Sequence, residues 1–203
     1  MSRERGMNMR IGIFGGTFDP IHMGHLLVAE QAREAGGLDE VWFIPNAEPP
    51  HKEAPVSAPH HRERMVELAI ADHPRFRLSR VELVRPGPSY TVDTVKDLKK
   101  AYPQTHFFLI VGADMMNDLP RWYKIEEILQ VVQVIGHLRP GVAAGDLPPF
   151  IASRLTLVED AVTLDLSSTD IRKRAAAGKS IRYLVPEKVR RYIEENRLYE
   201  NKP

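Results

Sequence analysis

Short apolar runs alternate along the chain with segments in which apolar residues recur at helical spacing. Continuous apolar runs are typical of strands covered on both faces of a parallel sheet. They begin at Ile11 and then occupy residues 41–46, 107–111 and 131–138. Helical spacing predicts helices between these runs, at residues 24–34, 59–73 and 122–130, and from Ser89 or Thr91 to Tyr102. Two further helices are predicted, one with a capping box that opens at Ser167 and stops at Gly178, the other with Pro186 at its first position.

This order of elements predicts an α/β fold, a single doubly wound and mostly parallel sheet with a small C-terminal helical part. We expect residues 10–203 to form one domain and the polar residues 1–9 to be a disordered tail, in which Met7 or Met9 could be the natural start. Weaker patterns predict a strand at 76–83 and short strands or extended segments at 155–158 and 162–166. Prolines place long loops at 47–59 and 140–149.

The stretch 11–26, IGIFGGTFDPIHMGHL, carries the strongest chemical indication. A strand ends at Gly15-Gly16, Thr17 follows, and a helix then begins with His22 and His25 on one face. Adjacent glycines let backbone N–H groups converge on an anion, and the helix start adds its positive end. Imidazoles there can donate hydrogen bonds and become cationic as negative charge develops on leaving oxygens. The stretch therefore predicts a polyphosphate site.

Other interpretations of this stretch have less support. The loop matches neither GxGxxG nor GxxxxGK[ST], so a dehydrogenase fingerprint and a Walker ATPase lose support. A glycine pair alone is usually a turn, and a histidine pair alone is more often a surface or metal pair. A metal held by His22 and His25 would lack further obvious protein ligands. We therefore predict no protein-bound metal, and regard the combined pattern as more specific than its parts.

Composition excludes several classes of partner. The 203 residues carry 28 basic and 27 acidic side chains, a net charge of +1, so neither a nucleic-acid polymer nor an anionic membrane is indicated. The absence of cysteine removes disulfides and thiolate sites and fits a reducing compartment. The polar N-terminus is unlike a signal peptide, and no apolar run approaches the roughly 18 residues of a membrane span. A cytoplasmic protein is predicted.

Six motifs in a fixed order resemble a known family. They are GGTFDPIHMGHL, VWFIPN with PPHK, GPSYTVDT, VGADMMNDLPRWY, LSSTDIR and YLVPEKVRRYI. Together they resemble the HxGH nucleotidyltransferases, and among them the bacterial nicotinate-nucleotide adenylyltransferases, over residues 10–199. Leu166 departs from the more usual Ile without chemical consequence. The resemblance implies a Rossmann-like fold and transfer of AMP from ATP to nicotinic acid mononucleotide, which yields nicotinic acid adenine dinucleotide and pyrophosphate.

The resemblance also implies which residues form the site, with His22 and His25 as the catalytic pair. The expected ATP-binding residues are Gly15, Gly16, Thr17, Phe18, Lys52, Gly112, Asp114, Ser167, Ser168, Thr169 and Arg172. The expected mononucleotide-binding residues are Gly15, Thr17, Ser89, Tyr90, Thr91, Trp122 and Tyr123.

Several of these assignments also have independent physical support. The helix start at 167–170, with Arg172 a turn later, offers hydroxyls, N–H groups and a cation for the β and γ phosphates. The alternative is an ordinary helix cap with a solvated arginine. Lys52 could reach the same phosphates, although an exposed lysine is often uninformative. Asp114 follows Gly112 like a ribose-binding carboxylate, or else caps a helix.

On the acceptor side, the indole of Trp122 suits stacking on a pyridinium ring, with a core position as the alternative. Backbone donors near Thr91 and Tyr123 could hold the carboxylate. Selectivity for the acid over the amide rests on the resemblance alone.

In the expected mechanism, the mononucleotide phosphate attacks the α-phosphorus in line, without an enzyme nucleophile. Mg²⁺ is expected to accompany ATP, held mainly by phosphates and water. Two rivals stay open: an HxGH transferase acting on phosphopantetheine or nicotinamide mononucleotide, and a non-catalytic nucleotide-sensing module. The oligomeric state is open too, a homo-oligomer included.

Overall fold

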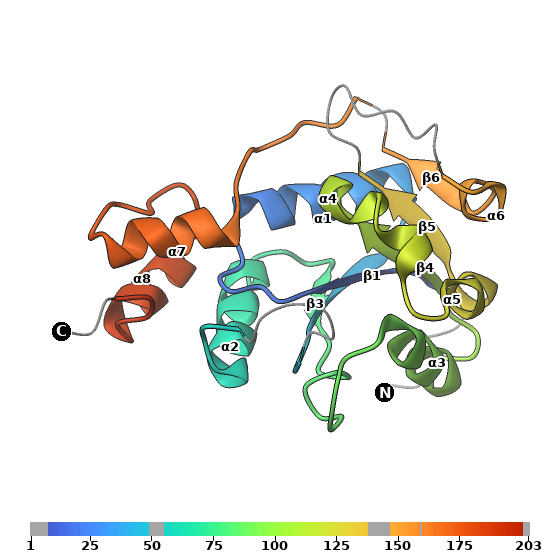
Figure 1. Cartoon of the computed structure of the whole chain (residues 1–203), viewed down its shortest axis with the longest axis horizontal. Helices are drawn as coiled ribbons and strands as arrows, with labels where there is room; N and C mark the ends of the chain where they lie inside the picture. The colour runs from blue at the N-terminus through green and yellow to red at the C-terminus, as the bar shows by residue number, and fades with distance from the viewer. Residues whose placement is uncertain (1–7, 49–54, 138–146, 159, 201–203) are drawn as a thin grey trace.

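The computed structural model describes residues 8–48, 55–137, 147–158 and 160–200, with only the backbone of residues 113 and 114. Six parallel strands form one sheet in the order β3-β2-β1-β4-β5-β6 (Figure 1). The strands are β1 (Arg10–Gly16), β2 (Glu40–Pro45), β3 (Phe76–Leu78), β4 (His106–Val111), β5 (Gln133–Gly136) and β6 (Leu155–Leu157). The predicted doubly wound α/β fold is confirmed.

Helices connect successive strands, as parallel pairing requires. The connecting helices are α1 (Met23–Ala35), α2 (Pro59–Ile70), α3 (Thr91–Ala101), α4 (Ala113–Met116), the 3-10 helix η2 (Leu119–Arg121), α5 (Ile125–Val131) and α6 (Pro149–Ala152). Two more helices, α7 (Ser168–Ala176) and α8 (Glu187–Glu195), follow β6. No described helix is long and apolar enough to cross a membrane.

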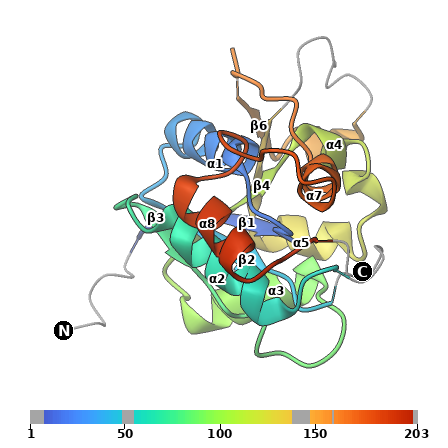
Figure 2. The same cartoon turned by 90° about the vertical axis from the view of Figure 1, so that its left-hand side faces the viewer.

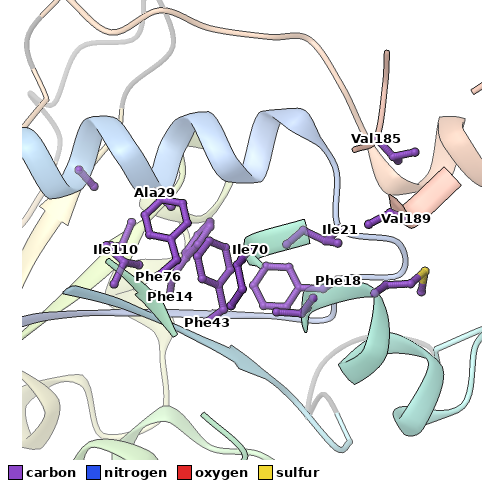
Figure 3. Packing of buried hydrophobic residues seen from close by; sticks show 14 of the residues in the cluster. Phe14, Phe18, Ile21, Ala29, Phe43, Ile70, Phe76, Ile110, Val185 and Val189 are labelled. Atoms are coloured by element: carbon purple, nitrogen blue, oxygen red, sulfur yellow. The ribbon is translucent and has the colours of Figure 1, made fainter. Parts of the chain in front are cut away.

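Alternation along the strands divides the core into two clusters, one on each face of the sheet. In β1, Ile11 and Ile13 pack with α3 and α5, whereas Phe14 packs with α1 and α2. Figure 3 shows Phe14 and Phe43 packed together beneath α1, with ring centroids 5.6 Å apart. Because both faces are covered, the strands are apolar throughout, which is the pattern that made them recognisable in the sequence.

The C-terminal helices belong to the cluster that contains α1 and α2. Val185 and Val189 lie on the side of this cluster where Phe18 is found (Figure 3). A hydrogen bond of 2.9 Å joins Tyr192 of α8 to His61 of α2, and the two helices lie together in Figure 2. The C-terminal helices are thereby packed near the loop that follows β1.

The direction of winding reverses between β1 and β4. From β1 the chain continues to β2 and β3 on one side, and β4, β5 and β6 add on the other. In open α/β sheets, ligands bind outside the carboxyl ends of strands at such a switch point. Gly15-Gly16 ends β1, and Gly112 follows β4. The predicted glycine loop therefore lies where the topology favours a ligand.

Several predicted boundaries were wrong for local reasons. The strand expected at 76–83 ends at Leu78, because the chain turns at 81–84 and buries Glu82 against α3. The helix expected at 122–130 begins at Ile125, because Trp122 is extended and Lys124 is left-handed. Pro186 caps α8 instead of occupying its first position.

Segment 162–166, predicted as a short strand or extended segment, does not join the sheet. Its first residue is hydrogen-bonded to the side chain of Gln31 instead. The Gln31 amide accepts from the Val162 N–H at 2.7 Å and donates to its carbonyl at 3.0 Å. Of the predicted loops, residues 49–54 and 140–146 lie outside the described residues. Of the predicted tail, 1–7 lie outside as well, whereas the backbones of Asn8 and Met9 bond to those of Gln104 and His106.

Candidate active site

The loop after β1 is shaped by the burial of Phe18. This residue adopts a left-handed φ of 51° and its side chain is only 2% exposed. A Cβ at Gly16 would lie 2.9 Å from the Phe18 ring, so that position excludes any larger residue. Gly15 is exposed and has open space around it. The Phe18 side chain is thus unavailable to ATP, and a contact from this residue would fall to its backbone.

His22 and His25 are brought together at the start of α1. His22 is the N-cap, and the two rings stack with centroids 3.7 Å apart and planes 23° apart. The backbone N–H of His22 donates to Nδ1 of His25 at 3.2 Å. Because Nδ1 accepts, the neutral His25 ring carries its proton on Nε2. The predicted shared face is therefore present, and the capping bond fixes the tautomer.

The His22 ring is buried. It is 5% exposed, and burial lowers its pKa to about 4, so the ring is neutral near pH 7. Its Nδ1 makes no hydrogen bond of full geometry among the described residues, and the nearest backbone donor is the His25 N–H, with which the His22 side chain forms the looser half of a capping box. That atom lies 3.1 Å from the position of a Cβ on Gly24, which explains the glycine between the histidines. Nε2 is the nitrogen left to reach a ligand.

The far end of the chain joins the turn that precedes His22. The Ser168 hydroxyl donates to the Pro20 carbonyl at 2.9 Å, and Arg172 Nη1 donates to the Asp19 carbonyl at 2.7 Å. Ser167 caps α7 by accepting from the Asp170 N–H at 3.1 Å, as predicted. Thr169 is exposed beside this cap. The two predicted anion sites are therefore neighbours.

Asp19 holds this turn, a role that the sequence analysis missed. One carboxylate oxygen accepts from the N–H groups of Val56 and Ser57 at 2.8 and 3.1 Å, and the other from the Tyr199 hydroxyl at 2.6 Å. Burial and the Asp19 charge raise the pKa of Tyr199, so its hydroxyl stays protonated and donates. A carboxylate this buried next to the glycine loop could only be found from the tertiary contacts.

Arg62 was also missed, although its position was readable. Its side chain is 0% exposed and donates to the carbonyls of Thr17 at 3.0 Å, Asn46 at 2.7 Å and Ala47 at 3.2 Å. It lies three residues before Met65 on the buried face of α2. A cation on an apolar helix face is the signal that could have identified it. Arg62 ties the loop after β1 to the end of β2.

The predicted acceptor residues form a second group around the start of α3. Ser89 is buried and its hydroxyl accepts from the Ala47 N–H at 3.2 Å, while Thr91 is the first residue of α3. The rings of Tyr90 and Tyr123 lie 5.0 Å apart. Trp122 packs half-buried against the core. Tyr123 is 52% exposed.

Two predicted ATP residues cannot be placed fully. Lys52 lies outside the described residues. Gly112 caps α4 and Asp114 lies within it, but only the backbone of Asp114 is described. Among the residues that the structure describes, no group of three or more His, Asp or Glu side chains could hold a metal ion.

Comparisons with known proteins agree on one family. Residues 13–174 match the cytidylyltransferase-like family model. The chain is 48% identical to the nicotinate-nucleotide adenylyltransferase of Bacillus subtilis strain 168 over 193 residues, 95% of this chain and 99% of that protein. Nicotinic acid mononucleotide adenylyltransferase from Plasmodium falciparum has the same fold in two solved structures, complexed with NaAD (TM-score 0.76, 21% identity) and with APC (0.75, 20%). Each alignment covers 95% of this chain and 98% of that one.

Proposed function

This chain belongs to the cytidylyltransferase-like family, among its nicotinate-nucleotide adenylyltransferases, and from that premise we propose how its site residues perform adenylyl transfer. The reaction transfers AMP from ATP to nicotinic acid mononucleotide in NAD biosynthesis. One observation carries the assignment of residues: the stacked His22 and His25 lie beside the glycine loop, at the turn to which Arg172 is hydrogen-bonded.

In the proposed mechanism the acceptor's phosphate oxygen attacks the α-phosphorus in line. The bond between the α-phosphorus and the bridging oxygen breaks, and pyrophosphate leaves with the electron pair. A phosphate is already anionic near neutral pH, so no general base and no covalent enzyme intermediate are needed. Catalysis then depends on positioning and on stabilising negative charge.

We assign His22 and His25 to the transferring and leaving phosphates. His25 can donate from Nε2 because its Nδ1 is engaged by the His22 N–H. His22 is neutral in the free enzyme, and the negative charge of a bound triphosphate would raise its pKa. Both rings therefore act as oriented donors whose hydrogen bonds strengthen as charge builds up on the leaving oxygens.

The remaining ATP contacts are assigned to the two ends of the chain. Phosphates are oriented by Gly15, Gly16 and Thr17. At Gly15, open space beside the backbone leaves room for a phosphate to approach. Ser167 to Thr169 and Arg172 receive the pyrophosphate end, where the helix start and the guanidinium favour anions. Binding there would have to share Arg172 with its bond to the Asp19 carbonyl.

The acceptor is assigned to the group near α3. Trp122 is the stacking platform for the nicotinate ring, and backbone donors near Thr91 and Tyr123 receive its carboxylate. The Ser89 hydroxyl connects this group to the segment after β2 by accepting a hydrogen bond from the Ala47 N–H. Discrimination between acid and amide would follow, because an amide offers no negative charge to these donors.

Mg²⁺ completes the proposal as a companion of ATP. It would neutralise charge on the β and γ phosphates, held by them and by water. The described residues offer it no cluster of carboxylates, so their contribution is to bind and orient the phosphates. A cytoplasmic location and the action of residues 10–203 as one domain stay predictions from the sequence.

Pyrophosphate release tests the proposal directly. The purified chain is supplied with ATP, Mg²⁺ and either nicotinic acid mononucleotide, nicotinamide mononucleotide or phosphopantetheine. The acid mononucleotide should give the highest kcat/KM, and absence of turnover with it would reject the assignment. His25→Ala should lower kcat by roughly a hundredfold or more while the protein still folds, since single oxyanion donors contribute that much. Near-normal turnover in this variant would reject the role of His25.

A further inference from the structure

The side chain of Asn46 lies between a buried cation and the phosphate loop. Its Oδ1 is 3.4 Å from Nη1 of Arg62, and its Nδ2 is 3.3 Å from the hydroxyl oxygen of Thr17. The backbone N–H of Asn46 also donates to the Gly16 carbonyl at 3.0 Å. One residue at the end of β2 thus contacts both the support of the loop and the loop itself.

The positive charge of Arg62 sets the donor and acceptor roles in this chain of contacts. Its Nη1 already donates to the carbonyls of Thr17 and Asn46, at 3.0 and 2.7 Å, so the 3.4 Å contact with Asn46 Oδ1 is a shared and longer one. A guanidinium has only donors, so the oxygen of the Asn46 amide must face Arg62 and its NH₂ group must face Thr17. The Thr17 hydroxyl oxygen therefore accepts from Asn46. Its own hydrogen is then left to donate elsewhere, and it needs an acceptor such as a phosphate oxygen.

The Arg62 side chain is held in place, and it therefore keeps the Asn46 amide in this orientation. It is completely buried, and its guanidinium also donates to the carbonyls of Thr17, Asn46, Ala47 and Ser57. These bonds hold its position in the free protein. The orientation of the Asn46 amide is consequently built into the free enzyme.

We propose that Asn46, oriented by Arg62, is a positioning residue that turns the Thr17 hydroxyl into a hydrogen-bond donor toward substrate phosphate. The inference rests on the proposed function, since it needs a phosphate next to Thr17. It goes further in assigning a direction to the hydroxyl and in naming the two residues that set it. Preorganised donors of this kind act without a reorganisation cost at the moment of reaction.

The substitution Asn46→Asp separates this role from a structural one. A carboxylate has the shape of the amide but only accepts, so the Thr17 hydroxyl would turn and donate to it, presenting lone pairs to the phosphate. The same carboxylate faces buried Arg62, so folding should be at least as stable as in the wild type. Reduced activity with an unchanged or raised Tm is the expected combination.

A double-mutant cycle with Thr17→Val tests whether the hydroxyl transmits the effect. Thr17→Val and Asn46→Asp should each lower kcat/KM by roughly tenfold or more, as expected for a hydrogen bond to a charged group. If Asn46 acts through the hydroxyl, adding Asn46→Asp to Thr17→Val should cost no more than about twofold. Thr17→Ser, which keeps the hydroxyl, should retain the full effect of Asn46→Asp. Asn196→Asp at the exposed end of α8 is the matched control and should leave kcat/KM unchanged.

The outcomes of the cycle are distinguishable. Equal losses from Asn46→Asp in the wild-type and Thr17→Val backgrounds would mean charge repulsion and would overturn the inference. Normal activity of Asn46→Asp beside an impaired Thr17→Val would overturn it while leaving the proposed function intact. Normal activity of Thr17→Val would reject both this inference and the proposed role of Thr17, whereas wild-type turnover of ATP and nicotinic acid mononucleotide independently tests the reaction itself.

Discussion

Gly24 separates the two histidines, and its missing methyl group leaves room for the ring of His22, which we propose to be catalytic. Its hypothetical Cβ would lie 3.1 Å from His22 Nδ1 and 3.2 Å from Cε1 of the same ring. Contacts this short are rare, so Gly24→Ala should push the ring by a few tenths of an ångström. Small misplacements of catalytic groups are costly, and we expect kcat to fall roughly tenfold.

The same substitution should not unfold the protein. Gly24 is in the first turn of α1, and alanine is favoured over glycine in helices by about 1 kcal/mol, which offsets the strain at the ring. Steady-state kinetics and urea unfolding of Gly24→Ala should therefore diverge, with activity lowered and stability nearly kept. A wild-type kcat would show that the ring does not need its present position.

His22 also makes stability depend on pH. Its folded-state pKa is about 4, below the value of about 6.5 expected in the unfolded chain. Between these values the unfolded chain binds a proton that the native state does not, so the free energy of unfolding falls as pH falls. About 3 kcal/mol of the free energy of unfolding therefore depends on His22 being neutral. This part is fully present above pH ~6.5 and is lost by pH ~4.

Urea unfolding measured between those pH values tests this contribution. His22→Gln should flatten the pH dependence relative to the wild type. Burial also lowers the pKa of His61 and His137, so a residual slope of the same sign should persist. Equal slopes for His22→Gln and wild type would contradict the prediction.

At the scale of elements, the segment after α8 secures the turn that carries the histidines. The Tyr199 hydroxyl donates to buried Asp19, whose other oxygen already holds Val56 and Ser57. A hydrogen bond to a charged group contributes about 1.5–3 kcal/mol, so Tyr199→Phe should lower the free energy of unfolding by that amount. Urea denaturation at neutral pH measures it.

Tyr192→Phe provides a matched control for this prediction. Its hydroxyl is also hydrogen-bonded, to His61 at 2.9 Å, but the partner carries no full charge when neutral. A neutral hydrogen bond contributes only about 1 kcal/mol. The loss in Tyr192→Phe should be clearly smaller, and equal losses would show that the Asp19 charge does not strengthen the bond.

Elements of the sheet could be predicted from sequence because burial on both faces leaves continuous apolar runs. The predicted boundaries of elements were wrong where a tertiary contact ends the element earlier than the hydrophobic pattern does. Alternation continued past Leu78, but the chain turns so that buried Glu82 can accept from the Thr94 hydroxyl at 2.6 Å. Arg62 was overlooked because a cation is expected in solvent, and only its helical position suggested otherwise.

At the scale of the whole molecule, the site depends on a contact that no local pattern encodes. Each of the two motifs was predicted from its residues to bind an anion, and the family resemblance implied that both serve one enzyme. Their contact through Ser168 with Pro20, and through Arg172 with Asp19, spans most of the chain. Contacts between residues so far apart in the sequence form because the C-terminal helices pack on the cluster that contains Phe18. The hydrophobic periodicity of the sequence does not reveal this packing.

Because the two motifs are joined, ATP should stabilise the whole fold and should depend on Arg172 to do so. A ligand present at 100 times its Kd adds about 2.7 kcal/mol to the free energy of unfolding, and a tenfold weaker Kd reduces this to about 1.4 kcal/mol. In Arg172→Ala we expect the ATP-induced increase in the free energy of unfolding to fall by about this much, since a guanidinium that binds phosphate contributes a charge-assisted hydrogen bond.

Arg174→Ala is the matched control. Arg174 lies on the same helix but is bonded to the Ser180 carbonyl, so this variant should keep the full ATP-induced increase. Urea unfolding with and without ATP measures the difference within each variant, so the loss of the Arg172 bond to Asp19 in the free protein cancels. Equal ATP-induced shifts in the two variants would place the pyrophosphate end elsewhere.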